Sequence, residues 1–147
     1  MTDLKRILLV EDNPHDAELT LAALEANHLA NEVVVLRDGA EALDYLHRRN
    51  AYADRPPENP VVVMLDLKMP KVDGLEVLRD VKGDEALRSI PIVMLTSSKE
   101  ERDLVESYRL GVNAYVVKPV DFAQFANAIR DSGVFWAVLN VTPQGGG

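Results

Sequence analysis

The stretch VVVMLDLKMPKVDG at residues 61–74 decides the fold that this sequence predicts. Its first five residues are all apolar, which is typical of a strand buried on both faces of a parallel sheet. The strand ends on Asp66, and the polar turn after it leads to Asp73 and Gly74, where a helix is predicted to begin. This order of strand, turn and helix is typical of an α/β domain.

Three other short apolar runs also end on polar residues. They are ILLV at 7–10 before Glu11 and Asp12, IVML at 92–95 before Thr96, and AYVV at 114–117 before Lys118 and Pro119. With EVVVLR at 32–37, strand and helix signals alternate five times, which predicts a parallel sheet covered by helices on both faces. Ligands of such sheets bind beyond the carboxyl ends of the strands, so the polar endings are expected to face one crevice.

These endings would bring together three carboxylates, a hydroxyl and an ammonium. Clustered carboxylates repel one another, and a hard divalent cation such as Mg²⁺ relieves that repulsion. An ammonium group beside these carboxylates is expected where an anionic ligand also binds. The set therefore indicates a carboxylate that accepts phosphate next to a metal ion.

Capping residues and apolar periodicity predict the helices. The first begins at Asn13 and Pro14 and has an apolar face of Leu19, Ala22, Ala23 and Ala26. The others are predicted after Asp38-Gly39, from Asp73-Gly74 to Gly83, over about 99–110, and from Asp121 through Phe135 and Trp136. Residues 48–60, RRNAYADRPPENP, are predicted to form a polar loop, either a tolerated surface insertion or a contact site for a partner.

Length and composition restrict the class of protein. The 147 residues fit one domain, and the hydrophobic and charged fractions of 47% and 27% are ordinary for a globular protein. The net charge of −8 disfavours binding to nucleic acid, and apolar runs this short predict no membrane span and no signal peptide. Without cysteine there is no disulfide or thiolate site, so we expect a soluble cytoplasmic domain.

The whole set of motifs resembles the receiver domain of two-component response regulators. The resemblance rests on the acidic pair, DLKMPKVDG at 66–74, LTSS at 95–98, GVNAYVVKP at 111–119 and the intervals between them. It extends from Lys5 into the last helix and implies a flavodoxin-like α/β fold: a doubly wound five-stranded parallel sheet of order 2-1-3-4-5 with five helices. We expect a receiver domain with an extended C-terminal helix over 1–142 and a flexible tail over 143–147.

The resemblance also implies roles for individual residues. Asp66 is expected to be the phosphoacceptor. Mg²⁺ is expected to be held by Asp12, by Asp66 and by the main-chain carbonyl of Lys68, with Glu11 acting through water. The phosphoryl group is then expected to be bound by Thr96, by Lys118 and by the main-chain N–H groups of Leu67 and Ser97.

Further positions in the resemblance concern switching and lifetime. The family implies a cis peptide bond between Lys118 and Pro119. Thr96 and Tyr115 match the switch pair, in which the hydroxyl moves toward the phosphoryl group and the aromatic ring turns inward. Lys68 and Ser98 match positions that set the lifetime of the acyl phosphate.

The long 48–60 loop and the tail FWAVLNVTP are similar to single-domain receivers that serve cyanobacterial and bacterial phytochromes. This similarity implies a light-sensing histidine kinase as partner, and the short tail predicts no further output module. Phe122 and Phe125 are expected in the core. Phe135 and Trp136 predict a homodimer through the fourth helix, last strand, fifth helix and tail, the alternative being a tail that folds back on its own domain.

Two other functions compete with the receiver interpretation. A haloacid-dehalogenase-type phosphatase also uses an aspartate nucleophile with Mg²⁺, but it needs a second aspartate two residues on, where this chain has Lys68. An interaction module that is not phosphorylated would be expected to lack part of the acidic pair, Asp66 or Lys118, and none is missing. The expected protein catalyses only its own phosphorylation and dephosphorylation and binds neither nucleic acid nor membrane.

Overall fold

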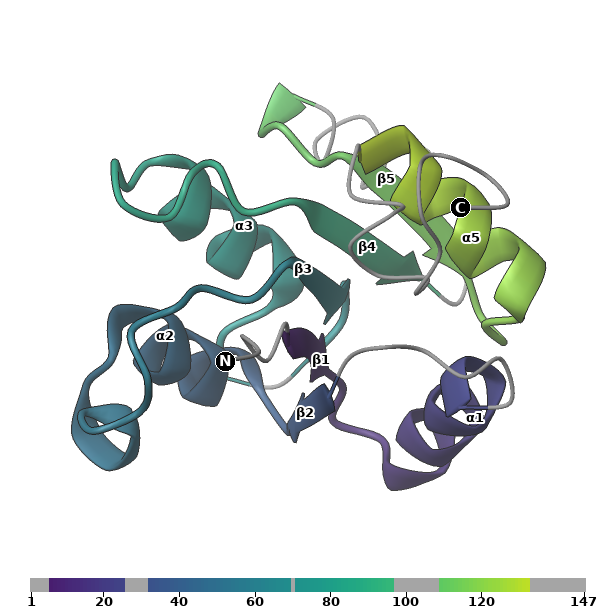
Figure 1. The fold of residues 1–147 in the computed structure, drawn as a ribbon, viewed down its shortest axis with the longest axis horizontal. Coiled ribbons are helices and arrows are strands. Elements are labelled where there is room, and N and C mark those ends of the chain that lie inside the picture. The colour runs from purple at the N-terminus through teal and green to yellow at the C-terminus, as the bar shows by residue number, and fades with distance from the viewer. Residues whose placement is uncertain (1–5, 26–31, 70, 97–108, 133–147) are drawn as a thin grey trace, which may run out of the picture.

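The computed structural model describes residues 6–25, 32–69, 71–96 and 109–132 (Figure 1). Its five strands form one parallel sheet in the order β2-β1-β3-β4-β5, which confirms the predicted architecture. The strands are β1 Arg6–Val10, β2 Glu32–Leu36, β3 Val62–Asp66, β4 Ile92–Thr96 and β5 Ala114–Val117.

Helices cover both faces of the sheet, with α1 and α5 on one side and α2 and α3 on the other (Figure 1). They are α1 Pro14–Glu25, α2 Gly39–His47, α3 Gly74–Lys82 and α5 Phe122–Ser132. Most of the predicted fourth helix and the continuation of the fifth through Phe135 and Trp136 lie outside the described residues. Among the described helices, none combines the length and the apolar character needed to cross a bilayer.

Side chains along each strand alternate between the two faces of the sheet. In β1, Leu8 and Val10 pack with the buried residues of α2 and α3, whereas Ile7 and Leu9 pack with those of α1 and α5. Every residue of β3 and β4 is likewise buried. The apolar runs are unbroken because neither face of these strands meets solvent.

The buried face of α1 differs from the predicted one. Leu19 is 44% exposed and Ala22 is also exposed, whereas the buried side chains are those of Ala17, Thr20 and Leu24. Both sets have helical spacing, and small alanines fit either face. The direction in which the chain leaves β1 decides which set meets the sheet.

Residues 48–60 form the predicted loop and are mostly exposed, and part of the loop packs against the end of α2. They contain a short 3₁₀ helix, Asn50–Tyr52, and Arg55, which is only 9% exposed. The Arg55 guanidinium donates hydrogen bonds to the carbonyls of Tyr45 (2.5 Å) and Leu46 (3.3 Å) and lies 4.5 Å from the centroid of the Tyr45 ring. This buried arginine therefore adds hydrogen bonds to carbonyls in the last turn of α2 and packs on the Tyr45 ring.

Candidate functional site

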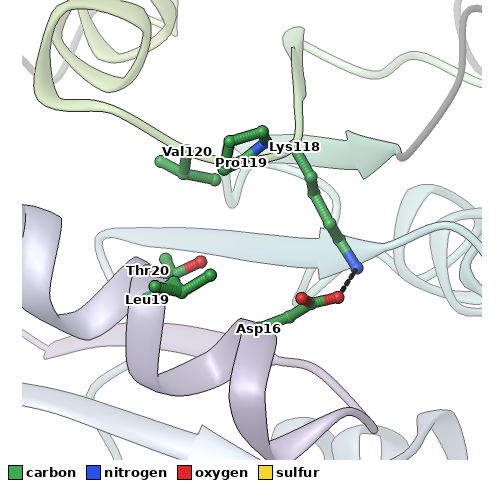
Figure 2. Close-up of a pocket in the computed structure, with 6 residues that line it drawn as sticks. All are labelled: Asp16, Leu19, Thr20, Lys118, Pro119 and Val120. Atoms are coloured by element: carbon green, nitrogen blue, oxygen red, sulfur yellow. Dashed lines mark hydrogen bonds and ion pairs between the residues drawn. The ribbon is translucent and has the colours of Figure 1, made fainter.

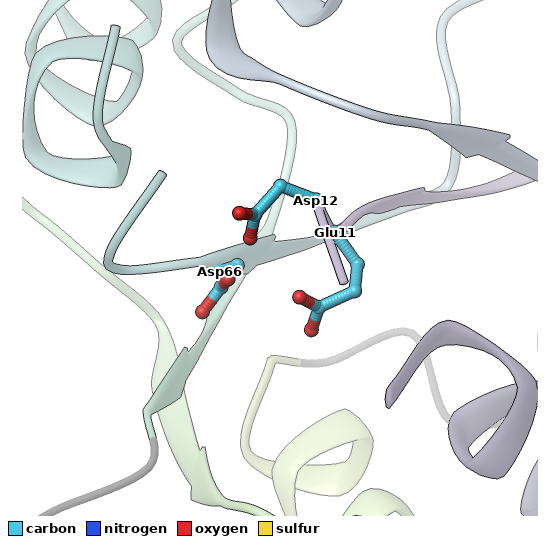
Figure 3. Close-up of side chains that lie close together, drawn as sticks. All are labelled: Glu11, Asp12 and Asp66. Atoms are coloured by element: carbon cyan, nitrogen blue, oxygen red, sulfur yellow. The ribbon is translucent and has the colours of Figure 1, made fainter. Parts of the chain in front are cut away.

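Three carboxylates converge at the carboxyl ends of β1 and β3. One oxygen from each of Glu11, Asp12 and Asp66 lies within 4.8 Å of the others (Figure 3). β1 and β3 are neighbours in the sheet, and the pairing of Val10 with Leu65 brings the residues that follow side by side. Glu11 and Asp66 are buried and Asp12 is exposed, so the cluster opens to solvent on the Asp12 side.

The Lys118 ammonium meets these carboxylates from the end of β5. Its Nζ lies 2.7 Å from Oε1 of Glu11 and 3.1 Å from Oδ1 of Asp66. The main-chain N–H of Lys118 donates to the Thr96 carbonyl (2.7 Å), and the peptide bond to Pro119 is cis. The acidic pair, the predicted phosphoacceptor and the predicted lysine therefore share one site.

Burial and neighbouring charges shift the ionisation of both partners of the ion pair. Burial, and then the charge of Glu11, raise the pKa of Asp66 to about 7 in the metal-free site, against the opposing effect of Lys118. Burial alone would lower the pKa of Lys118, but its contacts with the Glu11 and Asp66 carboxylates outweigh burial and raise that pKa. The ammonium therefore stays charged at neutral pH beside crowded carboxyl groups.

The donor atoms of this cluster fit a divalent cation. Oε2 of Glu11 accepts a hydrogen bond from the N–H of Asn13 (3.1 Å). Within the described part of the chain, the buried Oε1 accepts no hydrogen bond, and its polar contact is the ion pair with Lys118. A buried carboxylate oxygen that accepts no hydrogen bond, next to two further carboxylates, suits a hard cation that prefers oxygen ligands.

Two glycines allow close packing against Leu67 and Val72, which follow β3. The N–H of Gly74 donates to the Leu67 carbonyl (2.9 Å), and a Cβ at Gly74 would lie 2.9 Å from the Leu67 Cα. A Cβ at Gly39 would lie 2.8 Å from the Val72 carbonyl carbon. Leu67 therefore lies against the first residue of α3, and Val72 lies against the first residue of α2.

Two of the remaining predicted residues lie on β4, which is next to β3, and on β5, which is next to β4. Thr96 is buried at the end of β4 and pairs with Val117 of β5. Tyr115 is half-buried on β5, where it pairs with Met94. The predicted residues Ser97, Ser98, Phe135 and Trp136 lie outside the described residues.

The prediction for Leu67 needs correction. Its main-chain N–H donates to the Leu95 carbonyl at 2.9 Å. The pairing of β3 with β4 continues one residue beyond the end of β3, and this N–H is used there. We therefore leave Leu67 out of the anion site.

Sequence reasoning missed Asp16. The Lys118 ammonium donates a hydrogen bond to Oδ2 of Asp16 (3.3 Å), which lies in the first turn of α1 (Figure 2). Aspartate is ordinary in a first helical turn, where it interacts favourably with the helix dipole. Neither its type nor its position carried a signal of this contact.

Known proteins resemble this chain over most of its length. The probable methanogenesis regulatory protein FilR2 of Methanothrix harundinacea is 40% identical over 137 residues, which cover 93% of this chain and 86% of FilR2. Response regulator Rcp1 of Synechocystis is 37% identical over 132 residues, covering 90% of this chain and 88% of Rcp1.

Solved structures give the same result. The bacteriophytochrome response regulator AtBRR has a TM-score of 0.87 and 68% identity, covering 95% of this chain and all (100%) of that one. The Mn²⁺-bound form of Rcp1 has a TM-score of 0.76 and 36% identity, covering 94% and 97%. The sequence model of the response regulator receiver domain matches residues 7–130. Because of this match and these relatives, the chain belongs to the response regulator receiver domain family, whose members are signalling proteins that accept a phosphoryl group and switch conformation.

Proposed function

We propose that Asp66 accepts a phosphoryl group from a sensor histidine kinase in a reaction that requires Mg²⁺. The observation that carries this proposal is the position of the Asp66 carboxylate. It is buried at the end of β3, within 4.8 Å of the acidic pair and 3.1 Å from the Lys118 ammonium. A nucleophile, a cation site and a fixed ammonium are what phosphoryl transfer to a carboxylate needs.

In the proposed step, one carboxylate oxygen of Asp66 attacks the phosphorus of a phosphohistidine. The P–O bond forms as the P–N bond breaks, and the imidazole nitrogen takes the electron pair of the broken bond. Lys118 stands where it can neutralise charge on the phosphoryl oxygens, since its Nζ is already in contact with Asp66. Water later hydrolyses the acyl phosphate, so the protein acts only on its own phosphorylated state.

Mg²⁺ is the proposed resident cation. Asp12, Asp66 and the carbonyl of Lys68 would hold it, with Glu11 contributing through water. When bound, it would neutralise negative charge at the carboxylates and the phosphoryl group. The cluster of carboxylates and the Oε1 of Glu11 support a divalent cation, and the Mn²⁺-bound form of the relative Rcp1 is consistent with it.

The conformational output is proposed to use Thr96 and Tyr115. Thr96 would donate its hydroxyl to the phosphoryl group together with the N–H of Ser97, and Tyr115 would turn inward in response. The burial of Thr96 at the end of β4 and the half-buried state of Tyr115 on the adjacent β5 support this arrangement. Such a pair is a two-state element that a local charge can bias.

The proposed partner is a phytochrome-type histidine kinase. The support is the similarity to AtBRR, a bacteriophytochrome response regulator, over nearly the whole chain. We place the protein in the cytoplasm, where such kinases draw on ATP. The receiver unit and its C-terminal extension are proposed to run to residue 142.

Acetyl phosphate with Mg²⁺ tests the function directly. Intact-mass measurement after incubation should show a stable gain of one phosphate per chain. The competing phosphatase would instead release phosphate from esters over many turnovers, and a module that is not phosphorylated would show no mass gain. Either of these two results would overturn the proposal.

The metal site predicts unequal effects of two substitutions. Asp12→Ala should weaken Mg²⁺ binding by roughly tenfold or more, because a direct carboxylate ligand is lost. Glu11→Ala should weaken it less, because Glu11 is expected to act through water. Titration calorimetry on both variants would measure this, with Glu18→Ala, an exposed residue of α1, as the control. Equal affinities in wild type and the Asp12 variant would count against the site.

A second prediction concerns assembly. We propose a symmetric homodimer through β5, α5, the fourth helix and the tail that carries Phe135 and Trp136. Light scattering at tens of micromolar should give the mass of a dimer for wild type and a lower mass for Trp136→Ala. A wild-type monomer, with and without phosphorylation, would favour a tail folded back on its own domain.

A further inference from the structure

The Lys118 ammonium is shared by three carboxylates. Its Nζ lies 2.7 Å from Glu11, 3.1 Å from Asp66 and 3.3 Å from Asp16. Glu11 and Asp66 belong to the carboxylate cluster that fits a cation, whereas Asp16 is not part of that cluster. Figure 2 shows Lys118 extending from the connection between β5 and α5 toward Asp16 on α1. The third contact therefore joins a separate helix to the lysine.

These three contacts differ in strength. The side chains of Glu11 and Asp66 are 0% and 6% exposed, whereas that of Asp16 is 34% exposed and has the longest distance to the ammonium. Coulomb attraction weakens with distance and with exposure to water. Asp16 is therefore the partner that Lys118 can give up at the lowest cost in free energy.

Resting on the proposed function, we propose that Asp16 is a positioning residue that holds Lys118 before phosphorylation and releases it to the phosphoryl group. The ammonium already lies close to three carboxylates, so a new anion at Asp66 must compete with them for its charge. A cation at the cluster would offset the charges of Glu11 and Asp66. Asp16 lies outside the cluster, so its carboxylate would still compete with the phosphoryl oxygens for the Lys118 ammonium. Because Asp16 is partly exposed, its side chain can turn toward water instead.

Removing the charge of Asp16 should strengthen binding of a phosphoryl analogue. With saturating Mg²⁺, Asp16→Asn should bind beryllium trifluoride roughly two- to fivefold more tightly than wild type, the range expected for a partly exposed ion pair. Asp16→Glu, which keeps the carboxylate, should bind closer to wild type. Glu18→Gln removes one charge from the exposed surface of the same helix and should change the affinity little.

A second measurement separates positioning from a structural role in α1. In wild type, the ¹³C resonance of the Asp16 carboxyl should shift when beryllium trifluoride binds, because its ammonium partner leaves. Mg²⁺ affinity without the analogue should be the same in wild type and Asp16→Asn. Equal analogue affinities in these two proteins, or an unmoved Asp16 resonance, would overturn this inference alone. Failure of wild type to bind the analogue with Mg²⁺ present would overturn the proposed function and this inference with it.

Discussion

Replacing Asp66 with asparagine is expected to abolish phosphorylation by acetyl phosphate and leave the fold intact. An amide cannot attack phosphorus, but it keeps the shape of the side chain at the end of β3 and relieves the repulsion between Asp66 and Glu11. Intact mass after incubation with acetyl phosphate and Mg²⁺ would measure the phosphorylation, and circular dichroism would measure the fold. Asp54→Asn, in the exposed part of the 48–60 segment, is the matched control and should be phosphorylated like wild type. Phosphorylation of the Asp66 variant at the wild-type rate would show that another residue is the acceptor.

The same variant should change how stability depends on pH. In the folded, metal-free protein the pKa of Asp66 is raised to about 7 from its ordinary value of 3.8, so the folded state binds the proton more tightly than the unfolded chain. Wild-type stability should therefore fall as the pH rises between these two values. Asp66→Asn should remove this fall and be roughly 1–2 kcal/mol more stable than wild type at pH 8, with little gain below pH 4. This gain is smaller than the roughly 4 kcal/mol of the full shift, because the site opens to solvent on the Asp12 side and water screens the charges. Urea unfolding of both proteins at pH 8 and below pH 4, with a chelator present, would measure the difference in unfolding free energy. An equal difference in stability at both pH values would show that the ionisation of Asp66 is not the cause.

The elements and the composition of the site could be predicted because both depend on local sequence. Asn13 accepts hydrogen bonds from the N–H groups of His15 and Asp16, as expected of a capping residue at the start of α1. Asp73 caps α3 in the same way and exchanges hydrogen bonds with Glu76. In a parallel sheet all strands end at one edge, so polar residues that follow four strands meet there once the topology is known.

Contacts between distant segments could not be predicted in this way. Arg55 lies in a polar stretch rich in proline, and its burial depends on where α2 ends and which carbonyls its last turn presents. The ion pair of Asp16 with Lys118 joins residues 102 positions apart, and its formation depends on how α1 lies beside the connection between β5 and α5. The buried face of α1 depends on the same packing. A single sequence specifies none of these placements locally.

Replacing Gly74 with alanine is expected to have the largest effect on stability. A Cβ at this position would lie 2.9 Å from the Leu67 Cα and closer still to the Asp66 carbonyl oxygen, and both are main-chain atoms that cannot turn aside. We expect the variant to lose about 2–4 kcal/mol of unfolding free energy, at or above the usual cost of overpacking, because the close contacts are with main-chain atoms. Urea unfolding would measure it. Gly83→Ala is the control, because its Cβ would meet the Arg79 carbonyl at 3.2 Å, and it should change stability by less than about 1 kcal/mol.

Gly74→Ala should also weaken the metal site, which the control should leave unchanged. To make room for the methyl group, the chain must move at Asp66 and Leu67, directly before the Lys68 carbonyl that is proposed to hold Mg²⁺. Gly39→Ala tests the same segment from its other side, because a Cβ there would lie 2.8 Å from the Val72 carbonyl carbon. Calorimetry should show weaker Mg²⁺ binding in both variants than in Gly83→Ala. If Gly74→Ala kept the stability and the Mg²⁺ affinity of wild type, the residues after β3 could move without losing free energy. Their close packing would then not position the metal site.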